Sequence, residues 1–180
     1  METGRGFLRG QVDDAVVLHR AFVDALRDHG DDADDPRFSE LCARFMPIMK
    51  EHQRQLEDFQ SSLGAEGGIR KKVLGKVVGA ARELADVARE DDYRRLIGDI
   101  ALSSMAENAF RTFREAGRIL RDQRLAELGA LGERQHDDFN RDANRLAQAM
   151  FVEHVRAGEE SDQSGVRSRT GVSSSRAKRR

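Results

Sequence analysis

Apolar residues recur along most of the chain at alternating steps of four and three, a spacing that places them on one face of an α-helix. Four segments carry this pattern, at residues 7–29, 36–63, 91–120 and 124–156. No segment shows the strict alternation that is typical of a β-strand. In the second segment Asp35 is placed to cap the helix, Pro36 suits its first turn and Gly64 ends it. The pattern therefore predicts an all-α protein with four main helices.

The connections predict how these helices are arranged. Gly30 should end the first helix, and residues 121–123 should form a short turn between the last two. Residues 64–90 form a longer connection that begins with glycines and contains a shorter helix at 73–89. Short loops join antiparallel neighbours, and a long connection crosses the bundle. We therefore expect an antiparallel four-helix bundle with one long crossover between the second and third helices.

Histidines occupy three positions of the apolar stripes. His19, His52 and His136 stand on the faces that the first, second and fourth helices should bury, while Glu107 and Glu133 border the stripes of the last two. Glu107 and His136 each lie about 14 residues from the turn that joins their helices, so they should be level. His19 and His52 match less well, with a difference of about six residues or ~9 Å. Carboxylates and imidazoles facing each other in a bundle are ligands for iron or manganese.

The same histidines have a second interpretation. A single histidine on an apolar stripe is more often a neutral, hydrogen-bonded core residue than a metal ligand. The spacing of Glu133 and His136, three residues apart on one helix, also arises often by chance. Three histidines in three stripes raise the weight of the metal hypothesis, and both interpretations stay open.

Four stretches resemble the ferritin-like superfamily, especially a bacterial stress-associated branch: MKEHQRQLEDFQSSLG, KKVLGKVVGAARELADV, AENAF and GERQHDDFNRDANRL. The resemblance covers residues 8–156. It implies a ferritin-like bundle that binds iron or manganese, oxidises Fe(II) and acts in stress protection. It also implies ligand roles for Glu107 on the third helix, for Glu133 and His136 on the fourth, and for His52 on the second.

Two positions depart from the family pattern. Met49 stands three residues before His52, where the metal-binding members have a glutamate, and His19 stands where they have the first-helix glutamate. Only two of four carboxylates remain. The resemblance therefore implies a weakened or single-metal site, or a bundle without metal.

Charge divides the chain into two parts. Of the 180 residues 35% are charged and the net charge is −1, but the last 18 residues carry six basic side chains and no acid. Removing this +6 leaves the body near −7. The Ser- and Arg-rich composition predicts a bundle at 1–158 and a disordered basic tail at 159–180. The tail either aids solubility or contacts nucleic acid weakly, through Arg167, Arg169, Arg176, Lys178, Arg179 and Arg180.

Other features narrow the choice. Cys42 is the single cysteine, so no intrachain disulfide forms, and neither a leader peptide nor a membrane span is seen. We expect a cytoplasmic homo-oligomer with no membrane partner, and the acidic body argues against a curved bundle that coats membranes. Walker-type loops and hydrolase motifs are missing, and enzyme activity stays undecided. The main alternative to a metal-binding stress protein is a metal-free helical protein whose tail tethers nucleic acid.

Overall fold

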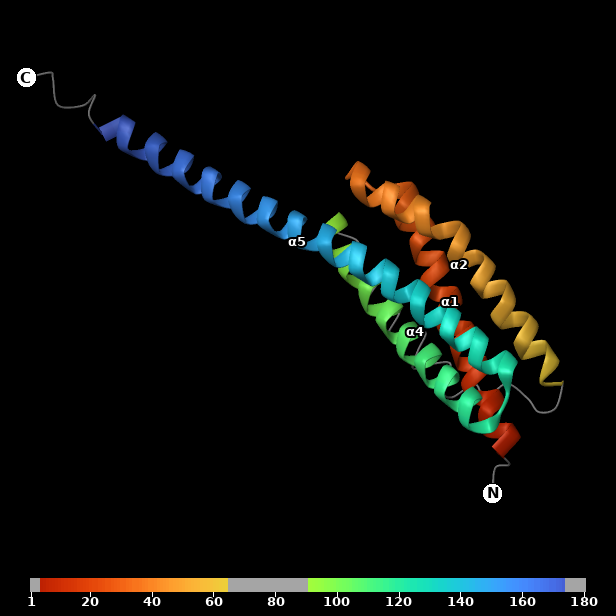
Figure 1. Ribbon diagram of the computed structural model, residues 1–180. Helices are drawn as coiled ribbons and strands as arrows, with labels where there is room; N and C mark the ends of the chain where they lie inside the picture. Colours follow the sequence, from red (N-terminus) through yellow and green to blue (C-terminus); the bar gives the residue numbers. More distant parts are fainter. Residues whose placement is uncertain (1–3, 65–90, 174–180) are drawn as a thin grey trace, which may run out of the picture.

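The structure, a computed structural model, describes residues 4–64 and 91–173, with side chains through residue 159 (Figure 1). It contains the helices α1 (Gly4–Asp32), α2 (Pro36–Ser62), α4 (Asp92–Leu120) and α5 (Gln123–Ser173), and the described residues form no strand. The prediction of an all-helical protein with four main helices is confirmed over these ranges. The crossover helix expected at 73–89 and the last seven tail residues, 174–180, lie outside them.

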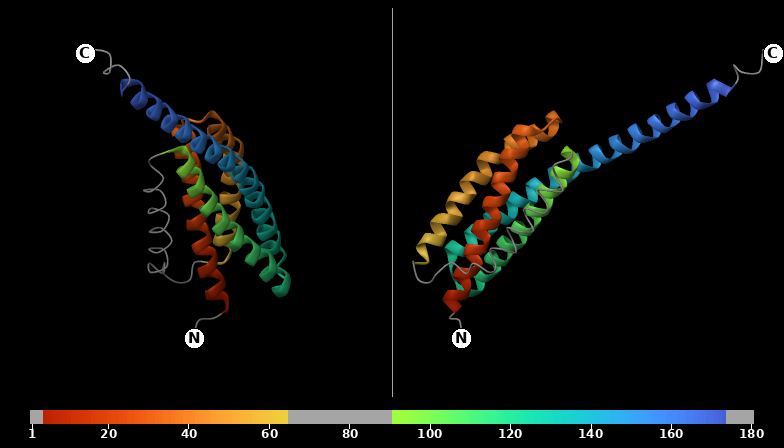
Figure 2. Two further views of the ribbon diagram at one scale, coloured as in Figure 1. Left: turned by 90° about the vertical axis from the view of Figure 1, so that its left-hand side faces the viewer. Right: turned by 180° about the vertical axis from the view of Figure 1, so that it is seen from behind.

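The four helices pack side by side around one core. α4 and α5 form the most extensive contact, α1 packs against α2 and α4, and α2 packs against α5. Figures 1 and 2 show this arrangement from three directions, with α5 continuing well beyond the other helices. The core is built from the apolar stripes, whose members are almost all buried. Each helix therefore contributes one face to a shared interior, as its periodicity predicts.

The signals at both ends of α2 act as expected. The Asp35 carboxylate accepts a hydrogen bond of 2.8 Å from the backbone N–H of Arg37, and Pro36 is the first helical residue. Gly64 follows the helix with a φ of +87°, a conformation that glycine adopts without steric cost. These local interactions fix the start and the end of α2.

Gly30 does not end α1, which continues to Asp32. This glycine instead permits a close approach to α2, because a Cβ atom at position 30 would lie 2.8 Å from the Cβ of Cys42. The hydroxyl of Ser39 donates a hydrogen bond of 3.0 Å to the Gly30 carbonyl. The residue was thus correctly expected near a helix end, but for the wrong physical reason.

The C-terminal segment also differs from expectation. We expected the last helix to end near Arg156 and disorder to begin at residue 159, whereas α5 is helical to Ser173. Residues 151–159 are all exposed, and the contacts of this stretch with the bundle are peripheral ones, from Phe151 and His154 to Tyr93 and from Glu153 to Arg37. No proline follows, and an interior glycine costs only about 1 kcal/mol. A helix that is already nucleated extends because each added residue gains a backbone hydrogen bond.

Glycines set the distance between α4 and α5. A Cβ atom at Gly129 would lie 2.2 Å from the backbone nitrogen of Arg114 and 2.6 Å from the carbonyl oxygen of Phe110. A Cβ at Gly117 would lie equally close to the backbone of Ala126. The two helices are therefore in backbone contact, and no side chain fits between them at these positions.

We expect Gly129→Ala to lower the free energy of unfolding by about 3 kcal/mol or more, since the methyl group must push two backbones apart. Urea denaturation followed by circular dichroism measures this loss. Gly10→Ala is the matched control, because a Cβ at Gly10 meets nothing within 4 Å and the helix should gain about 0.5–1 kcal/mol. An equal effect of the two substitutions would contradict the close contact.

Candidate functional site

The three stripe histidines meet in one layer of the core. His19 of α1, His52 of α2 and His136 of α5 are 0%, 1% and 0% exposed. The ring centroid of His19 lies 5.2 Å from that of His52 and 5.1 Å from that of His136. Phe110 of α4 packs against all three, with centroid separations of 5.7, 4.5 and 5.4 Å to His19, His52 and His136. We call His19, His52, His136 and Phe110 the histidine layer, to which each helix contributes one ring.

The expected mismatch in depth between His19 and His52 is therefore wrong. It was counted from a helix end at Gly30, but α1 runs to Asp32 and α2 begins at Pro36. His19 lies 13 residues before Asp32, and His52 lies 16 residues after Pro36. The remaining difference of three residues is less than one helical turn, so the two rings can meet.

Every histidine of the layer uses its Nδ1 atom in a hydrogen bond to a different helix. The three bonds join α1 to α2, α2 to α5 and α5 to α4, so together they tie all four helices at one level. They are His19 Nδ1 to Gln53 Oε1 at 2.8 Å, His52 Nδ1 to Gln135 Oε1 at 2.8 Å, and His136 Nδ1 to Ser103 Oγ at 2.9 Å.

The hydrogen bonds of Gln53 fix the tautomer of His19. The Nε2 group of Gln53 donates to the carboxylate of Glu57 at 2.6 Å and to the Val16 carbonyl at 3.4 Å. Its oxygen, which can only accept, therefore faces the imidazole. His19 must carry its proton on Nδ1, and its Nε2 atom holds a lone pair.

The second ring nitrogen of each layer histidine, Nε2, makes no hydrogen bond within the described residues. The Nε2 atoms of His19, His52 and His136 are all buried. A buried polar atom without a partner costs about 1–3 kcal/mol, so such atoms are rare in folded proteins. Three of them in one layer are a reason to look for a ligand.

Burial keeps these imidazoles neutral. It lowers the pKa of His19 to about 3 and that of His52 to about 4, and it moves the pKa of His136 well below the usual value. Repulsion from a charged His52 lowers the pKa of His19 further, and repulsion from His19 and His52 does the same for His136. Neutral rings at pH 7 have lone pairs available for a metal ion.

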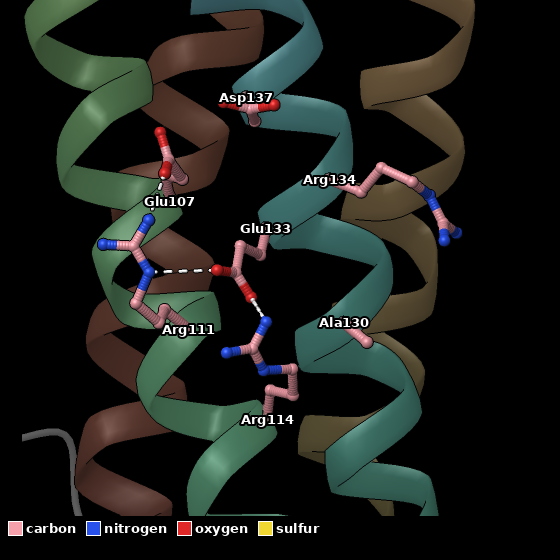
Figure 3. Close-up of a pocket in the computed structure, with 7 residues that line it drawn as sticks. All are labelled: Glu107, Arg111, Arg114, Ala130, Glu133, Arg134 and Asp137. Carbon is pink, nitrogen blue, oxygen red and sulfur yellow. Dashed lines mark hydrogen bonds and ion pairs between the residues drawn. The ribbon is translucent and has the colours of Figure 1, made fainter.

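The two glutamates lie outside the histidine layer, on the surface between α4 and α5 (Figure 3). Arg111 donates hydrogen bonds to Glu107 at 2.6 Å and to Glu133 at 2.9 Å. Arg114 pairs with the other oxygen of Glu133, and Asn140 donates to the other oxygen of Glu107 at 2.9 Å. Both carboxylates line a surface pocket of about 370 Å³ and are occupied by guanidinium and amide groups.

The carboxylate-rich dinuclear site implied by the family resemblance does not fit this arrangement. Counting residues from the turn predicted Glu107 to be level with His136, but it did not show that Glu107 lies on the surface between α4 and α5 while His136 lies in the core. Among residues 4–64 and 91–173, no group of three or more His, Cys, Asp or Glu side chains is arranged to hold a metal ion. The structure brings the three histidines together and leaves both glutamates apart from them.

Sequence reasoning missed the residues that anchor the layer. Gln53 and Gln135 are each adjacent in sequence to a layer histidine, forming the pairs His52-Gln53 and Gln135-His136. These adjacent pairs are the signal that could have found them. Ser103 and Phe110 of α4 carry no comparable signal, because neither has a layer histidine beside it in the sequence.

The structure describes the backbone of only two of the six basic tail residues. Arg167 and Arg169 fall within α5, whereas Arg176, Lys178, Arg179 and Arg180 lie outside the described residues. Within the described ranges no helix is long and apolar enough to cross a membrane.

Comparisons with known proteins add no family: no family model, curated protein or solved structure matches the chain. The resemblance to ferritin-like proteins therefore stays a hypothesis that rests on the residues themselves.

We expect acid to destabilise the fold through the histidine layer. Histidines titrate near pH 6.5 in an unfolded chain, but these are protonated only at much lower pH when folded. Stability is thus complete above pH 6.5 and falls as the pH drops towards 4, by up to ~1.4 kcal/mol per pH unit for each histidine. Urea denaturation at pH 7.5, 6 and 5 measures this slope.

His19→Leu should reduce the slope by about one third, because one of the three histidines no longer titrates. Burial raises the pKa of Asp99, which contributes a change of opposite sign, but this contribution is the same in both proteins and cancels in the comparison. Equal slopes for wild type and variant would show that His19 is not neutral in the core.

Proposed function

We propose that the protein is a ferritin-like antiparallel bundle that binds one transition-metal ion through the imidazoles of the histidine layer. The supporting observation is the set of three buried Nε2 atoms without partners. A shared metal ion would satisfy all three at once. Imidazole nitrogens are common ligands of zinc, copper, nickel and iron.

The surroundings of the histidines support this proposal. Metal-bound histidines usually donate the second ring N–H to an oxygen atom, which orients the ring and fixes the tautomer. Gln53 does this for His19, and the oxygen atoms of Gln135 and Ser103 occupy the same position for His52 and His136. These three hydrogen bonds support the proposal because they resemble the second contact of a metal-bound histidine.

Binding requires a local rearrangement. The ring of Phe110 packs against all three imidazoles, at 4.5 Å from the centroid of His52. The imidazoles must turn about their side-chain torsions, and Phe110 must move aside, before the Nε2 atoms can share an ion. Ring packing and metal binding are then alternative states of the same layer.

The donor set favours a single ion over the dinuclear iron or manganese centre of the family. Manganese prefers carboxylate oxygens, and the two glutamates that could supply them are held by Arg111 and Arg114. Oxidation of Fe(II) by a carboxylate-bridged pair is therefore not part of this proposal. A role in stress protection would have to come from holding the single ion.

Cobalt(II) titration tests the proposal, because a site built from imidazole nitrogens gives visible d–d absorption bands. We expect the full chain, purified without a metal-binding tag, to bind about one Co(II) and to lose the bands in His136→Gln. His154→Gln is the control, since His154 lies on the exposed part of α5. Circular dichroism checks that both variants are folded. Wild-type protein without bands, and without bound zinc or copper, would refute the proposal.

A second candidate function concerns α5. The helix carries Arg167 about 17 residues beyond Met150, the last buried residue of the bundle, which is roughly 25 Å. The backbone of α5 thus extends from the bundle towards the basic end of the chain. We propose that this end contacts nucleic acid without sequence preference.

Deleting residues 163–180 should abolish binding to a DNA duplex at low salt, as measured by fluorescence anisotropy. In the full chain the logarithm of the affinity should fall with the logarithm of the salt concentration, with a slope of up to about −5 for six basic residues. Binding that is unchanged by the deletion would place the contact elsewhere.

A further inference from the structure

An apolar patch is exposed where α5 extends beyond the other helices (Figure 1). Phe151, Val152 and Val155 are 54%, 44% and 46% exposed. Their spacings of three and four residues place them on one side of the helix. Phe151 contacts Tyr93 of α4 at a ring-centroid distance of 6.1 Å, and more than half of its surface stays exposed. Contiguous apolar surface of this kind marks a place where a partner binds.

The charges of the helix beyond this patch fall into two halves of equal length. We call residues 155–173 the arm, and Ser164 is its central residue. The nine residues before Ser164 carry one base and three acids, a net charge of −2, and the nine after it carry two bases and no acid, a net charge of +2. These residues are Arg156, Glu159, Glu160 and Asp162 in the first half, and Arg167 and Arg169 in the second.

This charge pattern matches a second arm that runs in the opposite direction. Two parallel arms bring acidic halves together and basic halves together, whereas two antiparallel arms place each acidic half beside a basic one. Glu159 and Arg169 lie five residues on either side of Ser164, so each faces the other residue of the second arm. Charges across a pair of helices set partner choice and orientation. A copy of this chain therefore complements the arm over its whole length.

The same alignment covers part of the apolar patch. Val155 lies nine residues before Ser164, and Ser173, the last residue of α5, lies nine residues after it. The end of one arm thus reaches Val155 of the other, with Val172 one position away. Exposed ion pairs contribute only about 0–1 kcal/mol each, so the charges select the orientation and the apolar contact supplies affinity.

The bundle end beside the patch is acidic. Glu153 binds Arg37 at 2.7 Å, which places the patch next to the start of α2. Residues 31–34, just before that start, include three exposed aspartates. The sequence that follows Ser173 adds four bases and no acid. In an antiparallel pair this basic sequence begins near the acidic end of the other bundle, which adds to the complementarity.

From the apolar patch and the charge pattern we infer that the arm binds a second copy of this chain, with the two arms side by side and antiparallel about Ser164. The interface has two-fold symmetry, so each half of one arm contacts the other half of its partner. The inference is independent of the metal-binding proposal. The arm's arginines then serve self-association, and nucleic acid competes for the same residues.

Sedimentation equilibrium of the full chain tests the association. All proteins carry Cys42→Ser to prevent disulfide dimers, and nuclease treatment removes nucleic acid that could bridge two chains. We expect the weight-average mass to rise with concentration from 20.2 kDa towards twice that value. Association should weaken about tenfold between about 0.05 M and 0.5 M salt, because ions screen the paired charges.

Phe151→Ser together with Val155→Ser should weaken association by about tenfold or more, since both side chains lose apolar contact. Ile119→Ser is the matched control, because Ile119 is 80% exposed at the other end of α4 and should not affect association. Circular dichroism checks that the variants keep the wild-type helix content.

An exchange of charges tests the complementarity. Glu159→Lys, Glu160→Lys and Asp162→Lys together make both halves of the arm basic. Arg167→Glu and Arg169→Glu together make both halves acidic. Each variant alone should stay monomeric at low salt, and an equimolar mixture of the two should associate.

Disulfide formation tests the orientation. Ser164→Cys, at the centre of an antiparallel pair, should cross-link two chains rapidly under mild oxidation. Arg156→Cys should not, because its two copies lie 16 residues or about 24 Å apart along the pair, far beyond the reach of a disulfide. Parallel arms would cross-link equally at both positions.

The remaining outcomes overturn the inference. They are a chain that stays monomeric at all concentrations at low salt, association that the patch variant does not weaken, charge variants that fail to associate when mixed, and equal cross-linking at both positions. None of these results affects the Co(II) test of the metal site. Duplex binding that persists in a chain that stays monomeric would leave the nucleic-acid proposal standing without this inference.

Discussion

Three imidazoles in an apolar core must find hydrogen-bond partners, and the way they do so determines how the four helices are aligned. Each ring reaches a neighbouring helix through Nδ1, and the three bonds close a chain from α1 through α2 and α5 to α4. Apolar stripes alone tolerate sliding, because one leucine can replace another in the same groove. A hydrogen bond of 2.8 Å does not, so the histidine layer fixes the relative depth of the helices.

The layer depends on the close contact of α4 and α5. Phe110 and His136 come from these two helices and stack with their rings 22° from parallel. A Cβ atom at Gly132 would lie 2.5 Å from Phe110 and 2.7 Å from the Cε1 atom of His52. The missing side chain at position 132 is therefore the space into which His52 and Phe110 fit. Glycine here shapes the candidate site rather than ending a helix.

Much of the fold follows from the sequence, because periodicity and capping are local. The stripes place His19, His52 and His136 in the core, and Asp35 and Gly64 mark the ends of α2. Position on the border of a stripe is less informative. A residue there lies to one side of the core direction, and the nearest strong partner decides where its side chain turns.

Glu107 shows how such a partner acts. Arg111 follows it by four residues on the same helix face and binds it at 2.6 Å, an interaction between positions i and i+4 that forms within one helix. The same guanidinium reaches Glu133 on α5. Counting residues from the turn gives the depth of these acids along their helices. It does not show that a nearby arginine will bind them in place of a metal ion. The anchoring residue Ser103 was beyond reach for a related reason, since its partner is 33 positions away.

Stability alone does not explain the histidine layer. Three hydrogen bonds between helices contribute about 1 kcal/mol each, whereas each of the three Nε2 atoms without a partner costs about 1–3 kcal/mol. The balance is near zero or unfavourable, and phenylalanine or leucine in the same positions would fill the core without buried polar atoms. The metal-binding proposal would give these Nε2 atoms the partners that the described structure lacks. The inner and outer polar groups of the bundle differ in this respect: the carboxylates of Glu107 and Glu133 on the surface are paired with arginines, whereas each imidazole of the neutral layer keeps one buried nitrogen atom without a partner among the described residues.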